Sequence, residues 1–160
     1  WSGMAAAEFA QGVLMAFVPH GESRVGRCGD VFVLQFYGAF NFEGAMLSFE
    51  KLKQCWLSAG APARWALLAD ARRWEGSTPE AIQTIEDVAS WCRENGLAAY
   101  ANLHANSFMR EIVLNNAKRE LGKAPEQHFD QVEVAWHWLA AQGFDCGDSA
   151  ARNLVEIPPL

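Results

Sequence analysis

Residues 63–80 read ARWALLADARRWEGSTPE, and this stretch contains the passage from strand to helix that decides the fold class. Its first part, Ala63 to Asp70, is an apolar run that ends in a carboxylate. Such a run is typical of a buried parallel strand that delivers polar residues to its C-terminal end. The residues ARRWEGST that follow are expected to form a loop.

A helix is predicted to begin directly after this loop. Ser77 or Thr78 can cap it, and Pro79 fits its first turn. Ser77 also lies at capping-box spacing from Glu80. The helix should run over about 79–95, up to an Asn-Gly stop. Its buried face is predicted to consist of Ile82, Ile85, Ala89 and Cys92.

A β-hairpin is predicted upstream of this unit. Two extended runs, ESRVGRC at 22–28 and VFVLQFYGAF at 31–40, flank a Gly-Asp turn. The first half of the second run is apolar except for Gln35, so this run should be a central strand covered on both faces. A helical period follows and is expected to end at Gly60. Its apolar face consists of Met46, Phe49, Leu52 and Trp56.

The same order of strand and helix recurs twice downstream. LAAYANL at 97–103 is predicted to be a strand, followed by a helix over 108–121. Residues 126–129 are predicted to form a short strand, after which Asp130 and Glu133 can cap a last helix. That helix should face the core with Val132, Ala135, Trp136 and Leu139.

This alternation of strands and helices predicts a single α/β domain. We expect a four- to five-stranded, mostly parallel sheet with an antiparallel N-terminal hairpin, right-handed β-α crossovers and about four main helices. The domain should span 22–143, between an N-terminal segment, 1–21, with a short helix over 5–18, and a C-terminal tail, 144–160. The opening Trp-Ser-Gly precedes two candidate start methionines, so it is expected to be partly an expression remnant.

The composition and net charge of the chain exclude some classes of function. Apolar residues make up 51% of the 160 residues and charged residues 20%, which is typical of a globular chain. The net charge of -6 is opposite in sign to that expected of a protein that binds nucleic acid or an anionic membrane surface. We therefore predict no nucleic-acid partner.

Cysteine usage and the N-terminal region predict a cytoplasmic protein. The apolar run at 12–18 precedes the first basic residue, Arg24, and so lacks the charged n-region of a signal peptide. It is also far shorter than the roughly 20 residues of a membrane helix, so no stable membrane insertion is expected. The four cysteines form no CxxC pair and are expected to be reduced thiols, namely Cys28, Cys55, Cys92 and Cys146.

The sequence contains no recognised catalytic motif. GxxxxGK[ST], GxGxxG after a strand and GxSxG are all absent. His128 and His137 have no acidic residue at metal-ligand spacing. A Cys-His nucleophile would need a thiol beside His104 or another histidine, whereas Cys55 and Cys92 fall next to predicted helix core faces. We predict no catalytic residue, no metal site and no cofactor.

Four segments taken in order resemble the SpoIIAA-like group of the STAS superfamily. They are GDVFVLQFYGAFNFEGA, WALLADARRWEGSTPEA, GLAAYANL and HFDQVEVAWHWLAAQG. The likeness covers about residues 22–143, and its most particular part consists of Phe129, Asp130, Ala135, Trp138 and Leu139. The resemblance implies a compact cytoplasmic domain of a β-α superhelix, similar in fold to CRAL-TRIO lipid-binding domains. Fold likeness by itself assigns no function.

The resemblance also implies a candidate phosphorylation site. In anti-sigma-factor antagonists of this superfamily, a serine at the start of the corresponding helix is phosphorylated within an Asp-Ser-Ser-Gly-like motif. Ser77 and Thr78 match that neighbourhood, although Glu75-Gly76 precede them and Pro79-Glu80 follow. The alternative is that both hydroxyls only cap the helix.

An anion site is a related hypothesis. Asp70, Arg72 and Arg73 are predicted to lie at the C-terminal end of a strand, where open α/β sheets bind ligands. The arginines could also assist a phosphate on Ser77 or Thr78. The alternative is a solvated loop, because Asp70 and Glu75 balance the two positive charges.

Aromatic residues suggest a contact surface. Trp136 and Trp138 differ by about 200 degrees around a helix, so they cannot face the same core. Trp136 is expected to be buried and Trp138 to be an interface residue, with Trp74 as a second candidate. We predict a non-enzymatic STAS-like regulatory or protein-interaction domain, which self-associates as a homodimer. The alternative is a pocket lined by aromatic residues that binds a lipid-like or other small apolar molecule.

Overall fold

Five strands form one sheet in the order β1-β2-β3-β4-β5 in a computed structural model that describes residues 18–106, 124–148 and 152. β1 runs antiparallel to β2, whereas β2, β3, β4 and β5 run parallel to one another. The elements are β1 (Glu22–Cys28), β2 (Val31–Phe40), α2 (Phe42–Ser58), β3 (Trp65–Ser77), α3 (Pro79–Glu94), β4 (Leu97–Leu103), β5 (Glu126–Phe129) and α5 (Val132–Ala141). This arrangement confirms the predicted α/β class and its N-terminal hairpin. β2 is an interior strand, but β3 is the central one.

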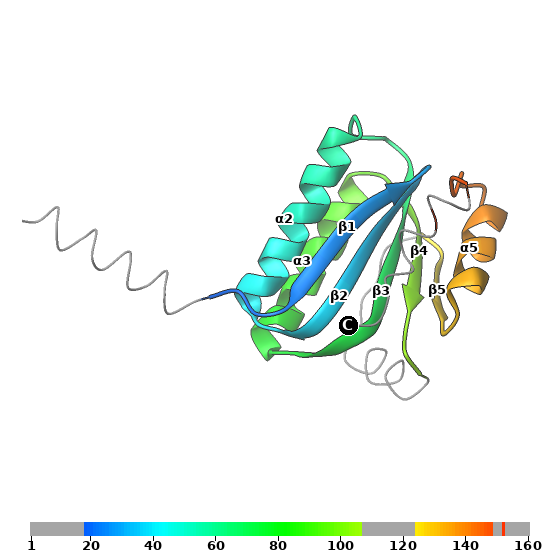
Figure 1. The fold of residues 1–160 in the computed structure, drawn as a ribbon. Coiled ribbons are helices and arrows are strands. Elements are labelled where there is room, and N and C mark those ends of the chain that lie inside the picture. The colour runs from blue at the N-terminus through cyan, green and yellow to red at the C-terminus, as the bar shows by residue number, and fades with distance from the viewer. Residues whose placement is uncertain (1–17, 107–123, 149–151, 153–160) are drawn as a thin grey trace, which may run out of the picture.

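Three helices lie in the described part of the chain, against about four expected. α2 and α3 cover one face of the sheet, and α5 lies on the other beside β4 and β5 (Figure 1). The helix expected over 108–121 lies outside the described residues, as do positions 5–17 of the one expected over 5–18. No helix among the described ranges is long and apolar enough to cross a membrane.

Strand alternation distributes the core over both faces of the sheet, because successive side chains point in opposite directions. Towards α2 and α3, the strands bury Phe32, Leu34 and Leu67 around Trp65. Towards α5, they bury Val33 and Leu68, with residues of the last helix packed against them. The α5 residues of this second cluster are Ala135, Trp136 and Leu139, as predicted.

The tight turn between β1 and β2 requires glycine. Gly29 has a φ of 60°, in the left-handed region, and a Cβ on it would collide with the backbone carbonyl of Asp145. The amide of Asp30 donates a 2.7 Å hydrogen bond to that same carbonyl. The turn therefore anchors the segment after α5 to the start of the sheet.

The predicted loop at 71–78 is wrong, because β3 continues to Ser77. Its second half pairs in parallel with β2, with Gly38 opposite Trp74 and Phe40 opposite Ser77. The register shifts between Gln35 and Tyr37 and again between Gly38 and Ala39, and at each shift β3 contains one extra residue. Backbone pairing does not depend on side-chain polarity, so charged residues that suggested a loop are tolerated in this strand.

Thr78 is confirmed as one of the two predicted caps, whereas the predicted capping box and the Asp130 cap are wrong. Thr78 is the N-cap of α3 and accepts a hydrogen bond from the amide of Ala81, so no capping box forms between Ser77 and Glu80. At α5 the N-cap is Gln131, whose side chain makes no capping bond, and Asp130 lies one residue too early. In both helices the N-cap residue is one position later than the capping-box spacing predicted.

Candidate functional site

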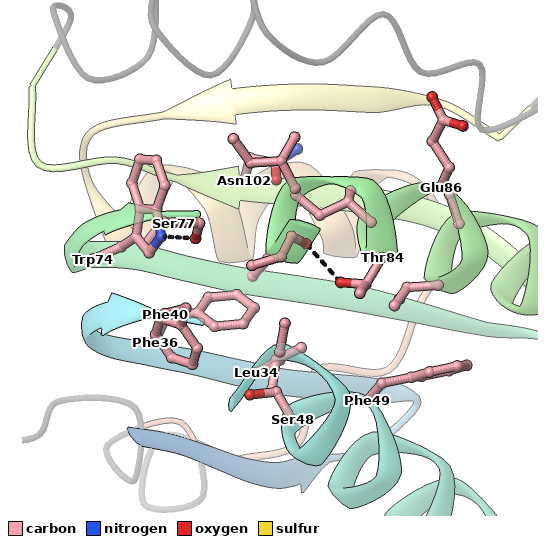
Figure 2. Close-up of a pocket in the computed structure, with 18 of the residues that line it drawn as sticks. Leu34, Phe36, Phe40, Ser48, Phe49, Trp74, Ser77, Thr84, Glu86 and Asn102 are labelled. Atoms are coloured by element: carbon pink, nitrogen blue, oxygen red, sulfur yellow. Dashed lines mark hydrogen bonds between the residues drawn. The ribbon is translucent and has the colours of Figure 1, made fainter. Parts of the chain in front are cut away.

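A cavity of about 330 Å³ lies between the sheet and helices α2 and α3 (Figure 2). Its floor is made by side chains of β2, β3 and β4 that point to this face of the sheet. Small residues line both the floor and the α3 wall, so the methyl groups of these alanines leave space that larger side chains would fill. These alanines are Ala69, Ala71, Ala81 and Ala89.

Aromatic side chains enclose the cavity. The rings of Phe36 and Phe40 meet edge to face with centroids 5.6 Å apart. Phe49 makes the same kind of contact with Trp91 at 5.5 Å. Trp74 lies at the end where β3 turns into α3 (Figure 2). Edge-to-face pairs hold these rings in defined orientations, so the walls are preformed.

Few polar groups of the described lining are available to a ligand. The hydroxyls of Ser48 and Thr84 donate to the carbonyls of Gly44 and Ala81 within their own helices. Ser77 accepts a 2.9 Å hydrogen bond from Nε1 of Trp74. The cavity is therefore apolar, with polar atoms only at particular positions.

A chain of four polar residues lies where β4 and β5 run side by side. Nε2 of His104 is 2.9 Å from Nδ1 of His128, and Nε2 of His128 is 3.6 Å from the carboxylate of Glu126. Asn102 donates a 3.0 Å hydrogen bond to the same carboxylate. Asn102 and His104 also line the cavity. One of the two facing ring nitrogens must be unprotonated, because two N–H groups cannot hydrogen-bond each other.

Sequence reasoning missed this chain of residues. It considered His128 with His137 and asked whether His104 faced a thiol, whereas the parallel register places Asn102 opposite His128. His137 is exposed on α5. The signal that could have found the cluster is the pair of polar residues at alternate positions, Asn102 and His104, at the end of an otherwise apolar strand.

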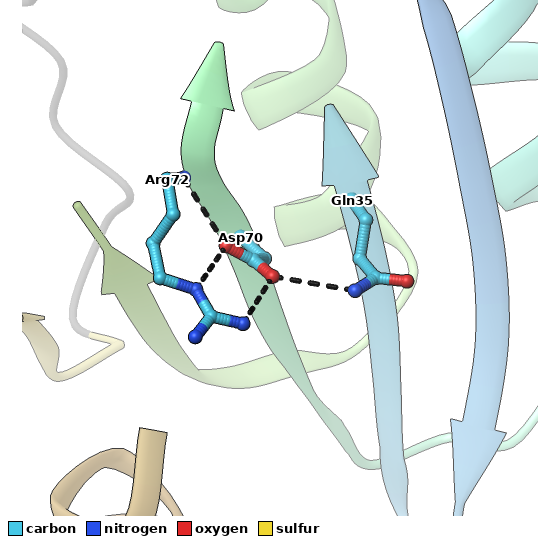
Figure 3. A network of polar contacts seen from close by, with 3 residues as sticks. All are labelled: Gln35, Asp70 and Arg72. Carbon is cyan, nitrogen blue, oxygen red and sulfur yellow. Dashed lines mark hydrogen bonds and ion pairs between the residues drawn. The ribbon is translucent and has the colours of Figure 1, made fainter. Parts of the chain in front are cut away.

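Two residues of the predicted anion site, Asp70 and Arg72, bind each other. Asp70 is buried within β3 rather than at its end, and Arg72 binds its carboxylate through Nε and Nη2, each at 2.9 Å (Figure 3). The backbone amide of Arg72 donates a third hydrogen bond, at 3.1 Å, and Gln35 donates a fourth, at 3.3 Å. Asp70 shares its face of the sheet with Leu68, whereas Ser77 lines the cavity on the other face. The structure therefore separates Arg72 from Ser77, and Arg72 and Asp70 neutralise each other.

The two candidate interface residues also lie on opposite faces of the sheet. Trp74 is half-buried at the cavity. Trp138 is half-buried against the α5 cluster, with its ring centroid 5.7 Å from that of Phe129. Trp136 is 2% exposed, which confirms its predicted burial. One continuous contact surface cannot include both Trp74 and Trp138.

All four cysteines are free thiols. Burial raises the pKa of Cys92, which lines the cavity, to about 12. Burial also raises the pKa values of the other three thiols, Cys28, Cys55 and Cys146. A raised pKa keeps the thiol protonated at neutral pH and unreactive as a nucleophile. Within the described ranges, no three His, Cys, Asp or Glu side chains gather in a way that could hold a metal ion.

Comparison with known proteins identifies the fold. No family model matches the sequence, and no curated protein matches it. An uncharacterized DUF3478-family protein from Shewanella loihica PV-4, whose fold is SpoIIAA-like, superposes with a TM-score of 0.56 at 13% identity. The match covers 77% of this chain and 96% of that one.

Two anti-sigma factor antagonists are similar in structure. One, from Mycobacterium paratuberculosis, has a TM-score of 0.53 at 14% identity over 76% of this chain and 95% of its own. The other, SpoIIAA in its unphosphorylated form, has a TM-score of 0.50 at 11% identity over 75% and 98%. At these identities the likeness concerns the fold alone. The chain therefore has a SpoIIAA-like fold.

Proposed function

We propose that this protein is a non-enzymatic binding domain whose cavity between the sheet and helices α2 and α3 takes up a small apolar molecule. The observation that carries the proposal is the cavity itself, about 330 Å³ in volume with mainly apolar and aromatic walls. Small-molecule pockets typically measure about 300–1,000 Å³ and have this kind of lining.

Binding is favoured over catalysis because the hydroxyl and thiol groups that line the cavity are not activated as nucleophiles. Among the described lining residues, Ser48 and Thr84 use their hydroxyl protons within their own helices. Cys92 is held as a neutral thiol by burial, which raises its pKa to about 12. None of these three groups is paired with a base that would activate it.

Calorimetric titration with toluene tests the proposal. Wild-type protein should bind one equivalent, and Ala69→Leu, which adds bulk to the cavity floor, should weaken binding at least tenfold. Ala140→Leu adds the same side chain at an exposed position of α5 and should leave binding unchanged. Ala71→Leu serves as a second cavity variant if Ala69→Leu does not fold. Absence of binding to wild-type protein, or equal binding by the cavity variants, would reject the proposal.

Regulation through protein contacts is the second candidate function. It is favoured by exposed apolar side chains on α2, where Phe42 and Leu47 are each 45% exposed and Leu57 is 54% exposed. Two proteins of similar fold are anti-sigma factor antagonists. An acidic domain with such a surface is suited to contact a second copy or another protein.

Sedimentation velocity over a range of concentrations tests the self-associating form of this candidate. We expect a dimer that Leu47→Lys and Leu57→Lys convert to monomer, while Gln54→Lys, at an exposed polar position of the same helix, has no such effect. A wild-type monomer at every concentration would reject self-association. Native mass spectrometry of the same sample would show whether a co-purified small molecule is bound instead.

A further inference from the structure

Resting on the proposed function, we infer that the cavity selects a neutral, flat aromatic molecule of about ten non-hydrogen atoms that donates one hydrogen bond to Oδ1 of Asn102. Indole has this chemistry. A fatty acid or other anionic lipid does not. Four properties of the cavity lead to this ligand class, namely its size, its charge, its aromatic walls and the orientation of one amide.

The volume limits the size of the ligand. One water molecule occupies about 30 Å³ of liquid, and one non-hydrogen atom needs a comparable space. A cavity of about 330 Å³ therefore accepts about ten such atoms. A one- or two-ring aromatic molecule fits in this volume.

The charge of the lining excludes an anionic ligand. No Lys or Arg belongs to the described lining, and the acidic residue there is Glu86, which is exposed. His104 is the described lining residue that can become a cation, and its Nε2 already faces His128. A ligand carboxylate would enter without a compensating charge, which is costly in an apolar site. The cavity therefore favours a neutral molecule.

The aromatic walls favour a flat ring over a flexible chain. Phe36 and Phe40 already meet edge to face, and Trp74 stands at the same end of the cavity (Figure 2). A ring inserted above Ala69 and Ala71 can make further offset or edge-to-face contacts with these walls. A rigid ring also loses less conformational entropy on binding than an alkyl chain.

The amide of Asn102 supplies the specific polar contact. Its nitrogen donates to the carboxylate of Glu126, which can only accept, so this bond determines which end of the amide points away from the cavity. The oxygen points towards the cavity interior (Figure 2). Asn102 is only 5% exposed, and no hydrogen bond within the described residues uses Oδ1. An accessible acceptor in this position favours a ligand with an N–H or O–H group.

Calorimetric titrations with indole, toluene and octanoate test the inference. Indole and toluene should both bind wild-type protein, and octanoate, which is similar in size to indole but charged, should bind at least tenfold more weakly than indole. Asn102→Leu should weaken indole binding about tenfold and change toluene binding less than threefold. Asn102→Ala, which removes the acceptor without adding bulk, replaces Asn102→Leu if that variant does not fold.

The outcomes separate this inference from the proposed function. Toluene binding combined with octanoate binding as tight as that of indole would overturn the inference and leave the cavity a binding site. Equal loss of indole and toluene affinity in both Asn102 variants would also overturn it. If none of the three probes binds wild-type protein, the proposed function itself fails.

Discussion

Nε1 of Trp74 donates a 2.9 Å hydrogen bond to Oγ of Ser77, three residues later at the end of β3 (Figure 2). This bond holds the indole ring at the cavity and engages Ser77 away from the start of α3. Thr78, the next residue, performs the capping instead. Two adjacent hydroxyls that look equivalent in the sequence therefore have different structural roles.

Substitutions at these two hydroxyls should have different effects. Thr78→Ala should lower the free energy of unfolding by about 0.5–2 kcal/mol because the amide of Ala81 loses its partner. Thr78→Asp should retain most of that stability, since aspartate is an equally good N-cap. Ser77→Ala should cost about 0.5–1.5 kcal/mol through its bond to Trp74 and leave the cap intact. Urea denaturation measures all three, and equal losses for Thr78→Ala and Thr78→Asp would contradict the capping role.

Phosphorylation of Ser77 or Thr78 stays a prediction from the resemblance. If the two hydroxyls serve only the contacts described above, incubation with a cell lysate and ATP should leave both unmodified by mass spectrometry. Phosphate on either residue, together with altered partner binding by Ser77→Asp or Thr78→Asp, would instead establish a switch. A phosphate on Thr78 would meet the N-terminal amides of α3, with Glu80 opposing it.

The Asp70 carboxylate should depend on Arg72 and not on Arg73. Arg72→Ala should lower the free energy of unfolding by about 1.5–3 kcal/mol, because the buried carboxylate loses its charged partner and keeps only the hydrogen bonds from Gln35 and from the backbone amide of residue 72. Arg73→Ala is the matched control and should stay within about 0.5 kcal/mol of wild type. Thermal and urea denaturation of both variants decide this. A larger loss for Arg73→Ala would show that the network is misassigned.

The last helix should tolerate changes at Trp138 better than at Leu139. Leu139 is fully buried, so Leu139→Ala should cost about 2–5 kcal/mol. Trp138 is half-buried against Phe129, so Trp138→Ala should cost less in stability. If its exposed part contacts a second copy, as we predicted, Trp138→Ala should also weaken association by about 2 kcal/mol. Sedimentation velocity of a folded Trp138→Ala variant with unchanged association would end that hypothesis.

Stability should fall in alkaline solution partly through Cys92. Burial raises its pKa from 9.0 to about 12. Between these two values the unfolded chain releases the thiol proton and the folded chain keeps it, so the unfolded state binds fewer protons and stability decreases as the pH rises. The slope for one such group approaches about 1.4 kcal/mol per pH unit. Urea denaturation from pH 8 to roughly pH 11 should show a shallower decline for Cys92→Ala. An unchanged slope would contradict the burial effect.

The sequence by itself determined the hairpin, the strands β4 and β5, the helix boundaries near Gly60, Gly96 and Gly143, and the burial of Trp136. These features follow from local signals. Alternating apolar and polar residues and continuous apolar runs predict the strands. Residues that permit a positive φ predict where the helices end. The resemblance to SpoIIAA-like proteins also predicted the fold correctly, because it depends on the order of such segments.

The tertiary structure alone decided where β3 ends, which hydroxyl caps α3 and which residues form the candidate site. β3 extends through Arg72 and Arg73 because β2 offers a backbone ladder beside it, and no property of those side chains signals this pairing. The cavity arises because alanines on β3 and α3 face each other across the gap, and the His104–His128 contact arises from the parallel register of β4 and β5. Such contacts join residues far apart in the chain, so no local pattern contains them.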